Sequence, residues 1–278
     1  MSRSRFVNGL YSRSYGSGQA HLVILHGLFG SGRNWHSVAR ALASQHLQVH
    51  CLDQRNHGNS SHFASHTLSD LVDDLKSWIE SCRLNNAMLL GHSMGGMAAM
   101  ACALTHPETV GALIVVDIAP RPYPPHHQKE FAALEVDVSD LQSRQAIDTA
   151  IQAIQPDAAV RQFLMMNVSK EPDGRYAWKL NVPVLKQAAF TARAVFQGAY
   201  QGPCLFIRGA QSNYITDADG AVIQTHFPKA SIATIPAAGH WLHHTHQPDF
   251  IRRIMSWMQS QADFKILAEP GLQFDMDL

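Results

Sequence analysis

The first 120 residues alternate short strand-like runs with segments of helical periodicity, and this alternation restricts the folds open to the chain. The strand-like runs are short and largely apolar, whereas the segments between them repeat apolar residues at helical spacing. Apolar strands that alternate with helices are typical of a parallel sheet covered by helices on both faces. The sequence therefore predicts an α/β fold with a mostly parallel central sheet. The expected strands are 21–25, 48–52, 87–90 and 110–116, and the expected helices are 35–45, 68–82 and 94–105.

Between residues 121 and 200 this alternation stops. The segment begins with a Pro-rich stretch, continues with mostly helical periodicity and contains no strong strand pattern. The alternation then resumes with strands at 204–207 and 231–235 and helices at 217–226 and 248–259. We therefore expect a discontinuous core, a helical insertion and a C-terminal tail without a clear period. The expected divisions are 1–120 and 201–262 for the core, 121–200 for the insertion and 263–278 for the tail.

The charge of the chain argues against a polyanionic partner. Its 22 Lys and Arg residues equal its 22 Asp and Glu residues, and only 16% of the chain is charged. A nucleic-acid-binding surface needs a basic patch, so we expect a small, weakly charged or amphipathic partner and no nucleic acid. The chain has no apolar run of about 18 residues that could cross a membrane. A monomer or a small homo-oligomer is the expected assembly.

The N-terminal segment and the cysteines bear on the compartment. Residues 1–18 lack the apolar block of a secretory signal, and their Arg and Ser content resembles a mitochondrial transit peptide only weakly. A hairpin over residues 6–11 with Asn8-Gly9 as its turn explains the segment better. The four cysteines form no C-x-x-C pair, so we expect free thiols and a cytoplasmic location. They are Cys51, Cys82, Cys102 and Cys204.

The sharpest local motif is Gly91-His92-Ser93-Met94-Gly95, which follows an expected strand and precedes an expected helix. A serine on a strained strand-to-helix turn exposes its Oγ, and the flanking glycines are needed because a Cβ at their positions would not fit the turn. This context is typical of a nucleophile elbow. We therefore expect Ser93 to be a nucleophile, with a structural turn serine as the alternative.

A second glycine-rich turn, residues 26–30 with the sequence HGLFG, follows the first parallel strand. A turn at this position can direct a backbone N–H at the oxyanion that forms when a nucleophile attacks a carbonyl. The residue after the nucleophile supplies the other N–H. We expect Leu28 and Met94 to form this oxyanion hole, with Phe29 as the alternative to Leu28 and a plain strand-to-helix loop as the non-functional interpretation.

The chain has 17 histidines, and their positions relative to the expected strands indicate which one can act as a general base. His240 follows a glycine at the carboxyl end of the last expected strand, where it is well placed to reach Ser93. His243, His244 and His246 fall on the following turn or helix, where packing or solvated roles are more common. We expect His240 to be the general base.

Together these motifs resemble the α/β-hydrolase superfamily over nearly the whole chain except the tail. Three stretches narrow the resemblance to the small YbfF-like esterase group: residues 53–60 (DQRNHGNS), 91–96 (GHSMGG) and 117–120 (DIAP). The resemblance implies a serine esterase with an α/β-hydrolase fold, in which residues 121–200 form the helical cap. The nucleophile, the acid and the histidine follow one another in this order along such chains.

The acid has more than one candidate. Most members of the superfamily place it after the strand that precedes Ser212, but here a serine occupies that position. Asp217 and Asp219 lie further along, where capping of a helix would account for them. Asp117 follows a buried strand, and a buried carboxylate needs a partner such as His240. The YbfF-like group is similar in using an acid at this place with a serine as a fourth member, so we expect Asp117 and Ser212 in these roles.

Other polar residues beside these motifs fit structural roles better than chemistry. Asp53, Arg55 and His57 form a cluster in the loop after an expected strand. We favour a loop brace over a substrate contact, with Arg55 paired to a carboxylate and Asp53 accepting backbone N–H groups. His26 and His92 are expected to be structural hydrogen-bond donors.

The expected reaction is hydrolysis of a carboxylic ester through an acyl-enzyme on Ser93, with thioesters such as acyl-CoA as further candidate substrates. It requires neither a metal nor an organic cofactor. We expect Phe29, Tyr123 and Trp241 to contact the substrate. A serine at the elbow argues against dehalogenases and epoxide hydrolases, which use Asp there. C–C bond hydrolases and cofactor-free perhydrolases share the same triad, and a binding protein that has lost turnover is a third alternative.

Overall fold

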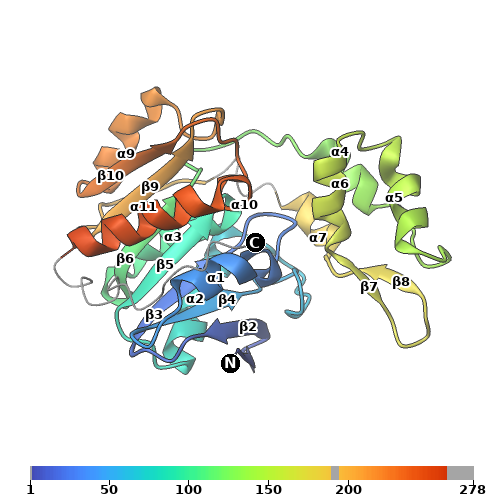
Figure 1. The fold of residues 1–278 in the computed structure, drawn as a ribbon, viewed down its shortest axis with the longest axis horizontal. Coiled ribbons are helices and arrows are strands. Elements are labelled where there is room, and N and C mark those ends of the chain that lie inside the picture. Colours follow the sequence, from blue (N-terminus) through green and yellow to red (C-terminus); the bar gives the residue numbers. More distant parts are fainter. Residues whose placement is uncertain (1, 189–193, 262–278) are drawn as a thin grey trace.

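The computed structural model describes residues 2–188 and 194–261 and has an eight-stranded sheet at its centre (Figure 1). The strand order is β1-β2-β4-β3-β5-β6-β9-β10, and neighbouring strands from β4 to β10 in this order run parallel. β1 and β2 are antiparallel additions at one edge. This arrangement confirms the predicted α/β fold. The strands are β1 Arg3–Val7, β2 Leu10–Tyr15, β3 Ala20–Leu25, β4 Leu47–Leu52, β5 Ala87–His92, β6 Val110–Val116, β9 Cys204–Gly209 and β10 Ala230–Ile235.

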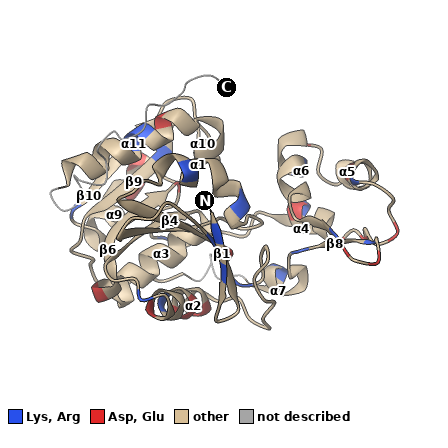
Figure 2. Ribbon diagram, turned by 60° about the horizontal axis from the view of Figure 1, so that its bottom comes forward, with Lys and Arg blue, Asp and Glu red and all other residues tan. Residues whose placement is uncertain are grey.

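Helices cover both faces of this sheet (Figure 2). The apolar side chains of α2, α3 and α9 pack on one face, and those of α1 and α11 pack on the other. The predicted core helices therefore occur, with shifts of a few residues at their ends. The helices are α1 His36–Leu42, α2 Leu68–Ser81, α3 Met94–Thr105, α9 Gly220–His226, α10 Leu242–Thr245 and α11 Gln247–Ser260, with 3-10 turns η1 Gly32–Trp35, η2 Pro107–Thr109 and η3 Asp217–Asp219.

α2 illustrates how local sequence sets these elements. The Thr67 side chain accepts a hydrogen bond from the Asp70 N–H (3.1 Å), and the Asp70 carboxylate accepts one from the Thr67 N–H (2.8 Å). This reciprocal cap satisfies two backbone donors that the first turn of a helix leaves free. Leu71, Leu75 and Trp78 then recur at helical spacing and are buried. The cap and the apolar stripe together determine where the helix begins and which face it buries.

β1 and β2 form the predicted N-terminal hairpin. Asn8 and Gly9 both have positive φ, 51° and 80°, which is the turn conformation that favours Asn-Gly. Asn8 Nδ2 also donates to the hydroxyl groups of Ser77 (2.7 Å) and Ser81 (2.9 Å) on α2, which fastens the hairpin to the core. Within the described ranges, no helix is both long enough and apolar enough to cross a membrane.

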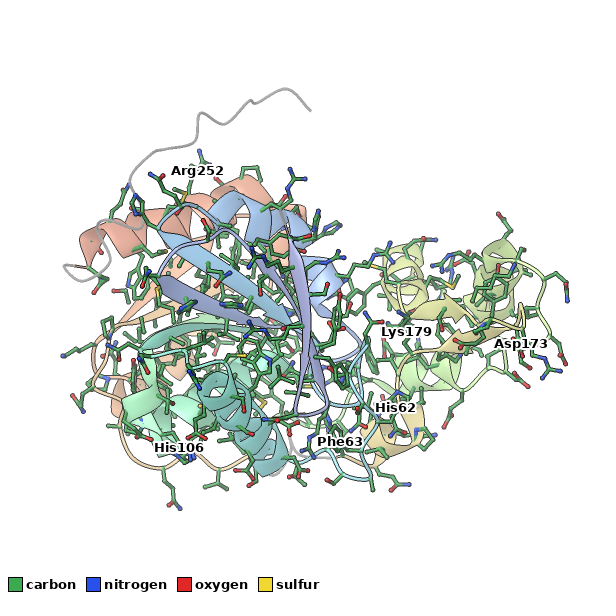
Figure 3. The ribbon with its side chains drawn as sticks, turned by 90° about the horizontal axis from the view of Figure 1, so that it is seen from below. His62, Phe63, His106, Asp173, Lys179 and Arg252 are labelled. Atoms are coloured by element: carbon green, nitrogen blue, oxygen red, sulfur yellow. The ribbon has the colours of Figure 1, made fainter. Side chains whose placement is uncertain are left out.

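The segment between β6 and β9 leaves the sheet and forms a group of short helices beside it (Figure 1). This group has its own buried apolar cluster, in which Phe29 of the core also takes part. At the junction with the core, His62 and Lys179 lie side by side (Figure 3), and His62 Nε2 donates to the Lys179 carbonyl (2.9 Å). Asn181 Nδ2 donates to Asn56 Oδ1 (3.0 Å) at the same junction. The elements are α4 Gln128–Leu134, α5 Arg144–Gln152, α6 Ala158–Met165, β7 Val168–Lys170, β8 Tyr176–Trp178 and α7 Val182–Gln187.

The sequence pattern does not predict β7 and β8, which pair as an antiparallel hairpin. Each strand has three residues, too few to show a clear alternation of buried and exposed side chains. The turn between them does carry a signal, because Pro172-Asp173-Gly174 is a typical turn sequence. Gly174 has a φ of 90°, and its N–H donates to the Glu171 carbonyl (2.9 Å). The expected tail, 263–278, lies outside the described residues.

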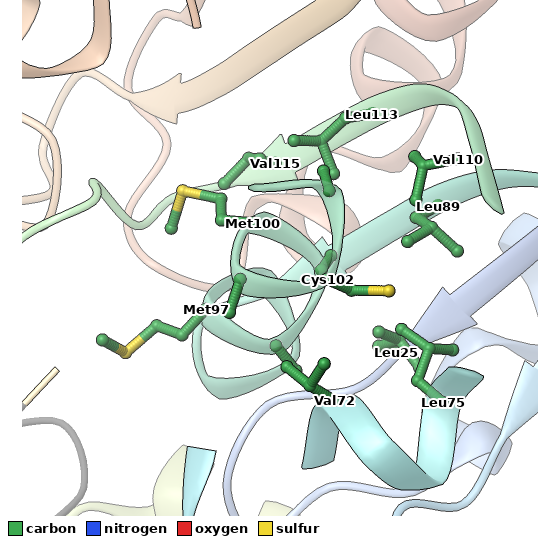
Figure 4. Close-up of a cluster of buried hydrophobic side chains, with 14 of the residues drawn as sticks. Leu25, Val72, Leu75, Leu89, Met97, Met100, Cys102, Val110, Leu113 and Val115 are labelled. Carbon is green, nitrogen blue, oxygen red and sulfur yellow. The ribbon is translucent and has the colours of Figure 1, made fainter. Parts of the chain in front are cut away.

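α3 is surrounded by other elements, which holds its first residue in place (Figure 4). Met97 and Cys102 of this helix are fully buried among apolar side chains of α2, β5 and β6. Leu75 of α2 lies on one side of the helix, and Leu89 and Val115 of the sheet lie on the other (Figure 4). A helix that is apolar on all sides is expected in such a position. The residue at the start of α3 therefore has a rigid support.

Candidate active site

Ser93 stands at the junction between β5 and α3. It precedes the first residue of α3 with φ 51° and ψ −117°, a conformation that residues with a side chain rarely adopt. A Cβ on Gly95 would lie 2.4 Å from the Leu25 carbonyl oxygen, and one on Gly91 would lie 2.2 Å from the Gly95 carbonyl oxygen. The two glycines therefore meet the steric requirement that the sequence motif predicts for a tight strand-to-helix turn.

A buried pair of an acid and a histidine lies beside this turn. Asp117 follows β6 directly, has a φ of 52° and has no exposed surface. Its carboxylate accepts hydrogen bonds from His240 Nδ1 (2.7 Å), the Gly209 N–H (3.2 Å) and the Ser212 hydroxyl. The carboxylate is the acceptor in this pair, so the contact places an N–H on His240 Nδ1 and makes Nε2 the nitrogen that can accept a proton. This is the tautomer that a general base requires.

The two other acidic candidates are engaged elsewhere. Asp217 is almost fully exposed and forms an ion pair with Arg208 (2.7 Å). Asp219 is buried, accepts from Arg121 Nε (2.6 Å) and caps the turn that begins at Thr216. Helix capping and a surface ion pair therefore account for both carboxylates, and the structure brings Asp117 to His240 in their place.

Ser93 lies where two cavities meet. It lines a cavity of ≈ 250 Å³ together with His240 and Trp241, and a cavity of ≈ 400 Å³ together with Met94 and Tyr123. The walls of both cavities are mainly apolar, and several histidines line the smaller one. The residues that line both cavities are Leu28, Ser93, His126, His127 and Tyr214.

The turn formed by residues 26–30 lies against Ser93 as the sequence predicts. A backbone hydrogen bond of 3.0 Å from the Gly30 N–H to the Gly27 carbonyl closes it, and Phe29, the third residue of this four-residue turn, has a φ of 63°. Asn167 Nδ2 of the insertion donates to the Phe29 carbonyl (2.8 Å) and holds the turn in place. Leu28 lines both cavities. Met94 begins α3, so its N–H has no acceptor within the helix.

The three residues expected to contact substrate all line a cavity. Phe29 lines the smaller one, but its ring is 3% exposed and lies 5.0 Å from the ring of Phe131. Trp241 also lines the smaller cavity, beside the ring of Phe163 (5.5 Å). Tyr123 lines the larger one, and two hydrogen bonds to backbone groups, of 2.8 and 2.5 Å, occupy its hydroxyl. Tyr123 therefore presents its ring rather than a free hydroxyl.

The sequence does not reveal the aromatic partner of His240. The ring of Tyr214 stacks on the imidazole, with 3.9 Å between centroids and 17° between planes, and its hydroxyl hydrogen-bonds to His126 Nε2. Burial, together with the carboxylate of Asp117, raises the pKa of Tyr214 to about 12, so the hydroxyl stays protonated at neutral pH. His127 is a further wall residue without a motif. These side chains meet because the loop after β9 folds against the start of the insertion.

His26 and His92 have the structural contacts that the sequence predicts. His92 Nε2 donates to the backbone carbonyl of His240 (3.0 Å), and burial lowers the pKa of His92 well below its usual value. His26 Nδ1 donates to the Gly27 carbonyl (2.9 Å), and its Nε2 accepts from the Gln54 N–H (3.0 Å). Burial lowers the pKa of His26 to about 4. Both rings are therefore neutral at pH 7 and fix backbone near the site.

The cluster after β4 forms a brace. Asp53 accepts from two backbone N–H groups (2.6 and 2.8 Å), and Arg55 pairs with Asp74 (2.6 Å) and Asp70 (3.0 Å). His57 is fully buried, and neither it nor Asp53 nor Arg55 lines the two cavities at Ser93. Across residues 2–188 and 194–261, no group of three or more His, Cys, Asp or Glu side chains is arranged to hold a metal ion.

Comparison with known proteins bears directly on this site. Residues 20–162 match the family described as alpha/beta hydrolase fold. The chain is 36% identical over 264 residues to the sn-1-specific diacylglycerol lipase ABHD11 of Danio rerio. This alignment covers 91% of this chain and 83% of that protein. The chain is 34% identical over 235 residues to the Esterase YbfF of Escherichia coli, which covers 84% and 90%. A solved structure, "Marine microorganism esterase", superposes with a TM-score of 0.85 at 38% identity and covers 89% and 98%.

These matches, together with the sheet order and the elbow at Ser93, define the class of protein: the chain belongs to the α/β-hydrolase family. Within that family it is a carboxylic ester hydrolase of the YbfF-like esterase group. The group is the one that the motifs at 53–60, 91–96 and 117–120 indicate.

Proposed function

We propose that the chain hydrolyses its ester substrate through an acyl-enzyme on Ser93. Ser93 Oγ attacks the ester carbonyl while His240 Nε2 takes the hydroxyl proton, and the N–H groups of Leu28 and Met94 stabilise the oxyanion. Asp117 holds the His240 tautomer and stabilises the imidazolium that forms. His240 then gives the proton to the leaving oxygen. Water attacks the acyl-enzyme by the same route and releases the acid.

One observation carries this proposal. The hydrogen bond from His240 Nδ1 to the buried Asp117 carboxylate (2.7 Å) lies beside an elbow serine that lines the same cavity as His240. The hydrogen bond from Ser212 to the same carboxylate supports a role for Ser212 as a fourth member that orients Asp117. Neither Asp217 nor Asp219 has such a contact.

The two cavities indicate where the parts of the ester bind. His240 lines only the smaller cavity, and the leaving alcohol takes its proton from His240, so we place the alcohol there. Met94 lines only the larger, mainly apolar cavity, so we place the acyl chain there. Each buried CH₂ group contributes about 0.8 kcal/mol, which favours apolar chains that fill this space. The name of the Danio rerio relative adds diacylglycerol to the substrates worth testing.

The insertion supports a role as a cap over the acyl chain. His127, Phe131 and Leu185 come from residues 121–200 and line the larger cavity opposite Ser93 and Met94. We therefore keep the division into a core, 1–120 and 201–262, and a cap as part of the proposal. The four free cysteines support a reducing compartment such as the cytoplasm.

Replacing the nucleophile tests the mechanism. Ser93→Ala is expected to lower kcat/KM for a short nitrophenyl ester by roughly 10⁴-fold or more, because the acyl-enzyme no longer forms. A fluorophosphonate probe should label the wild-type chain and Ser69→Ala, an exposed control on α2, but not Ser93→Ala. Full activity or full labelling of folded Ser93→Ala would refute the role of Ser93.

A substrate panel tests the assignment of the cavities. We expect kcat/KM to rise with the length of the acyl chain until the larger cavity is filled, and then to fall. The panel compares nitrophenyl esters of graded length, the matching acyl-CoA thioesters and a diacylglycerol. The ratio of thioester to ester turnover at equal chain length decides between these classes. A rate that is independent of chain length would contradict the placement of the acyl group.

A further inference from the structure

A separate cavity of ≈ 250 Å³ lies at the other end of the sheet from Ser93. Its wall includes His21 and Gln48, which stand near the amino ends of β3 and β4, whereas Ser93 and Asp117 follow the carboxyl ends of their strands. The rest of the wall comes from β1, β2, His50 of β4, Trp78 in the last turn of α2 and the residues 82–84 that follow this helix. The cavity has no wall residue in common with the two cavities at the active site.

The charge of this cavity is positive and unbalanced. Arg3 and Arg5 of β1 and Arg83 after α2, all three exposed, line it, and none of its wall residues is acidic. Within the described part of the chain, none of these three arginines has an ion pair or a side-chain hydrogen bond. The acidic residues Asp70 and Asp74 of α2 are paired with another arginine in the loop after β4. The cavity therefore presents cations without counter-charges.

Two buried polar groups in the wall have no hydrogen-bond partner among the described residues. They are Ser12 Oγ and Trp78 Nε1, and these two side chains are 0% and 1% exposed. A buried polar group without a partner costs about 1–3 kcal/mol, so native structures rarely leave one unused. Both atoms lie behind the wall without accessible surface, so they add to the polarity of the wall but do not themselves contact a ligand.

A hydrogen-bonded chain along the wall also ends in a free donor. Ser14 Oγ contacts His50 Nδ1 (2.8 Å), and His50 Nε2 contacts His21 Nδ1 (3.1 Å). Burial lowers the pKa of His50 to about 3, so its ring is neutral and carries one N–H. If Ser14 donates to His50, the Nε2–H of His21 is left over; in the opposite direction, the hydroxyl hydrogen of Ser14 is left over. Either arrangement leaves a donor.

Protection of the sheet edge explains only part of this pattern. Charged side chains on an edge strand such as β1 discourage pairing with another chain, which accounts for Arg3 and Arg5. It does not account for Arg83, which follows α2, or for the unpartnered groups of Ser12 and Trp78. A ligand rich in acceptor oxygens and negative charge would pair with the arginines and accept from the free donor of the Ser14–His50–His21 chain.

We propose that this cavity binds a phosphate group, either as inorganic phosphate or as a small phosphate monoester. One arginine guanidinium group can donate two parallel hydrogen bonds to phosphate oxygens. Three arginines also carry enough positive charge to neutralise a phosphate dianion. A volume of ≈ 250 Å³ is below the roughly 300–1,000 Å³ of cavities that enclose drug-sized ligands. The phosphate group is therefore held between β1 and α2, and any larger remainder extends into solvent. This site is independent of the catalytic assignment.

Calorimetry and thermal unfolding of the full chain test the proposal. Inorganic phosphate and glycerol phosphate, each at constant ionic strength against chloride, are expected to bind saturably and to raise Tm. The double variant Arg5→Gln/Arg83→Gln should bind roughly tenfold more weakly or worse. Arg13→Gln is the matched control, because Arg13 lies on β2 with its side chain on the opposite face from Ser12 and Ser14. The ligand that binds more tightly identifies the source of the phosphate.

A second variant separates binding from folding. Trp78→Phe keeps an aromatic ring and removes an unpartnered N–H that lies behind the wall, so the ligand-free chain should unfold at an unchanged or slightly higher temperature while phosphate binding stays unchanged. Nitrophenyl ester hydrolysis reports that each variant is folded. The proposal is overturned if phosphate does not bind at millimolar concentration, or if it raises Tm equally in the wild type and in Arg5→Gln/Arg83→Gln.

Discussion

Single residues in this site show how backbone strain and hydrogen bonding act together. Ser93 and Asp117 both have positive φ and both directly follow a parallel strand. Such conformations cost of the order of 1–3 kcal/mol each and persist only where the surroundings impose them. The buried Asp117 carboxylate is stabilised by hydrogen bonds from His240, Ser212 and the Gly209 N–H. A buried charge with fewer partners would be protonated or unstable.

Replacing Asp117 and Asp217 by Asn, one at a time, tests which carboxylate is the catalytic acid. Asp117→Asn is expected to lower kcat by roughly 10⁴-fold, because an amide can hold His240 in the wrong tautomer. Asp217→Asn, the matched control on the surface, should leave kcat unchanged. Ser212→Ala should give an intermediate loss of about tenfold, since it removes one hydrogen bond to a charged group. Loss of activity in Asp217→Asn alone would show that the acid is misplaced.

The order of the elements brings together residues that are distant in sequence. The Ser93 N–H donates to the Val116 carbonyl (3.1 Å), and the Asp117 N–H donates to the Ile207 carbonyl (2.9 Å). Each residue is thereby tied to the neighbouring strand of the sheet, β6 in one case and β9 in the other. The insertion contributes the other side of the site, because α4 and α7 line the larger cavity.

A substitution on α4 tests this contribution of the insertion. Ala132 lines the larger cavity, and Ala132→Phe fills part of the space proposed for the acyl chain. We expect kcat/KM for long-chain esters to fall by at least roughly tenfold while acetate and butyrate esters are hydrolysed normally. Ala150→Phe on the exposed face of α5 is the matched control and should change neither. An equal loss for short and long esters would point to misfolding or to a different acyl site.

Across the whole molecule, several buried histidines share a lowered pKa. Burial lowers the pKa of His26 to about 4 and the pKa values of four others to about 3. These rings are packed in the sheet and its loops, and they remain neutral in the folded chain at pH 7. These five residues are His26, His50, His57, His66 and His243, and His92 is a sixth buried histidine, whose pKa burial lowers well below its usual value.

The buried histidines predict acid sensitivity of the fold. The unfolded chain binds protons at histidine below pH about 6.5, whereas the folded chain leaves these five rings neutral until pH 3–4. Stability is therefore level above pH about 6.5, and each ring lowers the free energy of unfolding by about 1.4 kcal/mol per pH unit below it. Urea unfolding at pH 7.5, 6.5 and 5.5 measures this slope. The exposed variant His244→Gln should not change the slope, and a constant stability down to pH 5 would contradict the prediction.

Features that depend on short stretches of chain are determined by the sequence alone. The strands of the core follow from their apolar runs, α2 follows from its cap and stripe, and the Asn8-Gly9 hairpin follows from its turn. The elbow at Ser93 belongs to this group as well, because the steric need for Gly91 and Gly95 arises within one turn of chain. Periodicity and local sterics are sufficient for these predictions.

The tertiary structure alone decided which distant groups became neighbours. Sequence reasoning favours Asp117 but leaves Asp217 and Asp219 open, and only the adjacency of β6, β9 and β10 shows which carboxylate reaches His240. The stacking of Tyr214 on His240 is likewise invisible in the sequence pattern. The same is true of the arginine-lined cavity between β1 and α2. The reason is physical: these contacts join segments far apart along the chain, and no local period or turn encodes them.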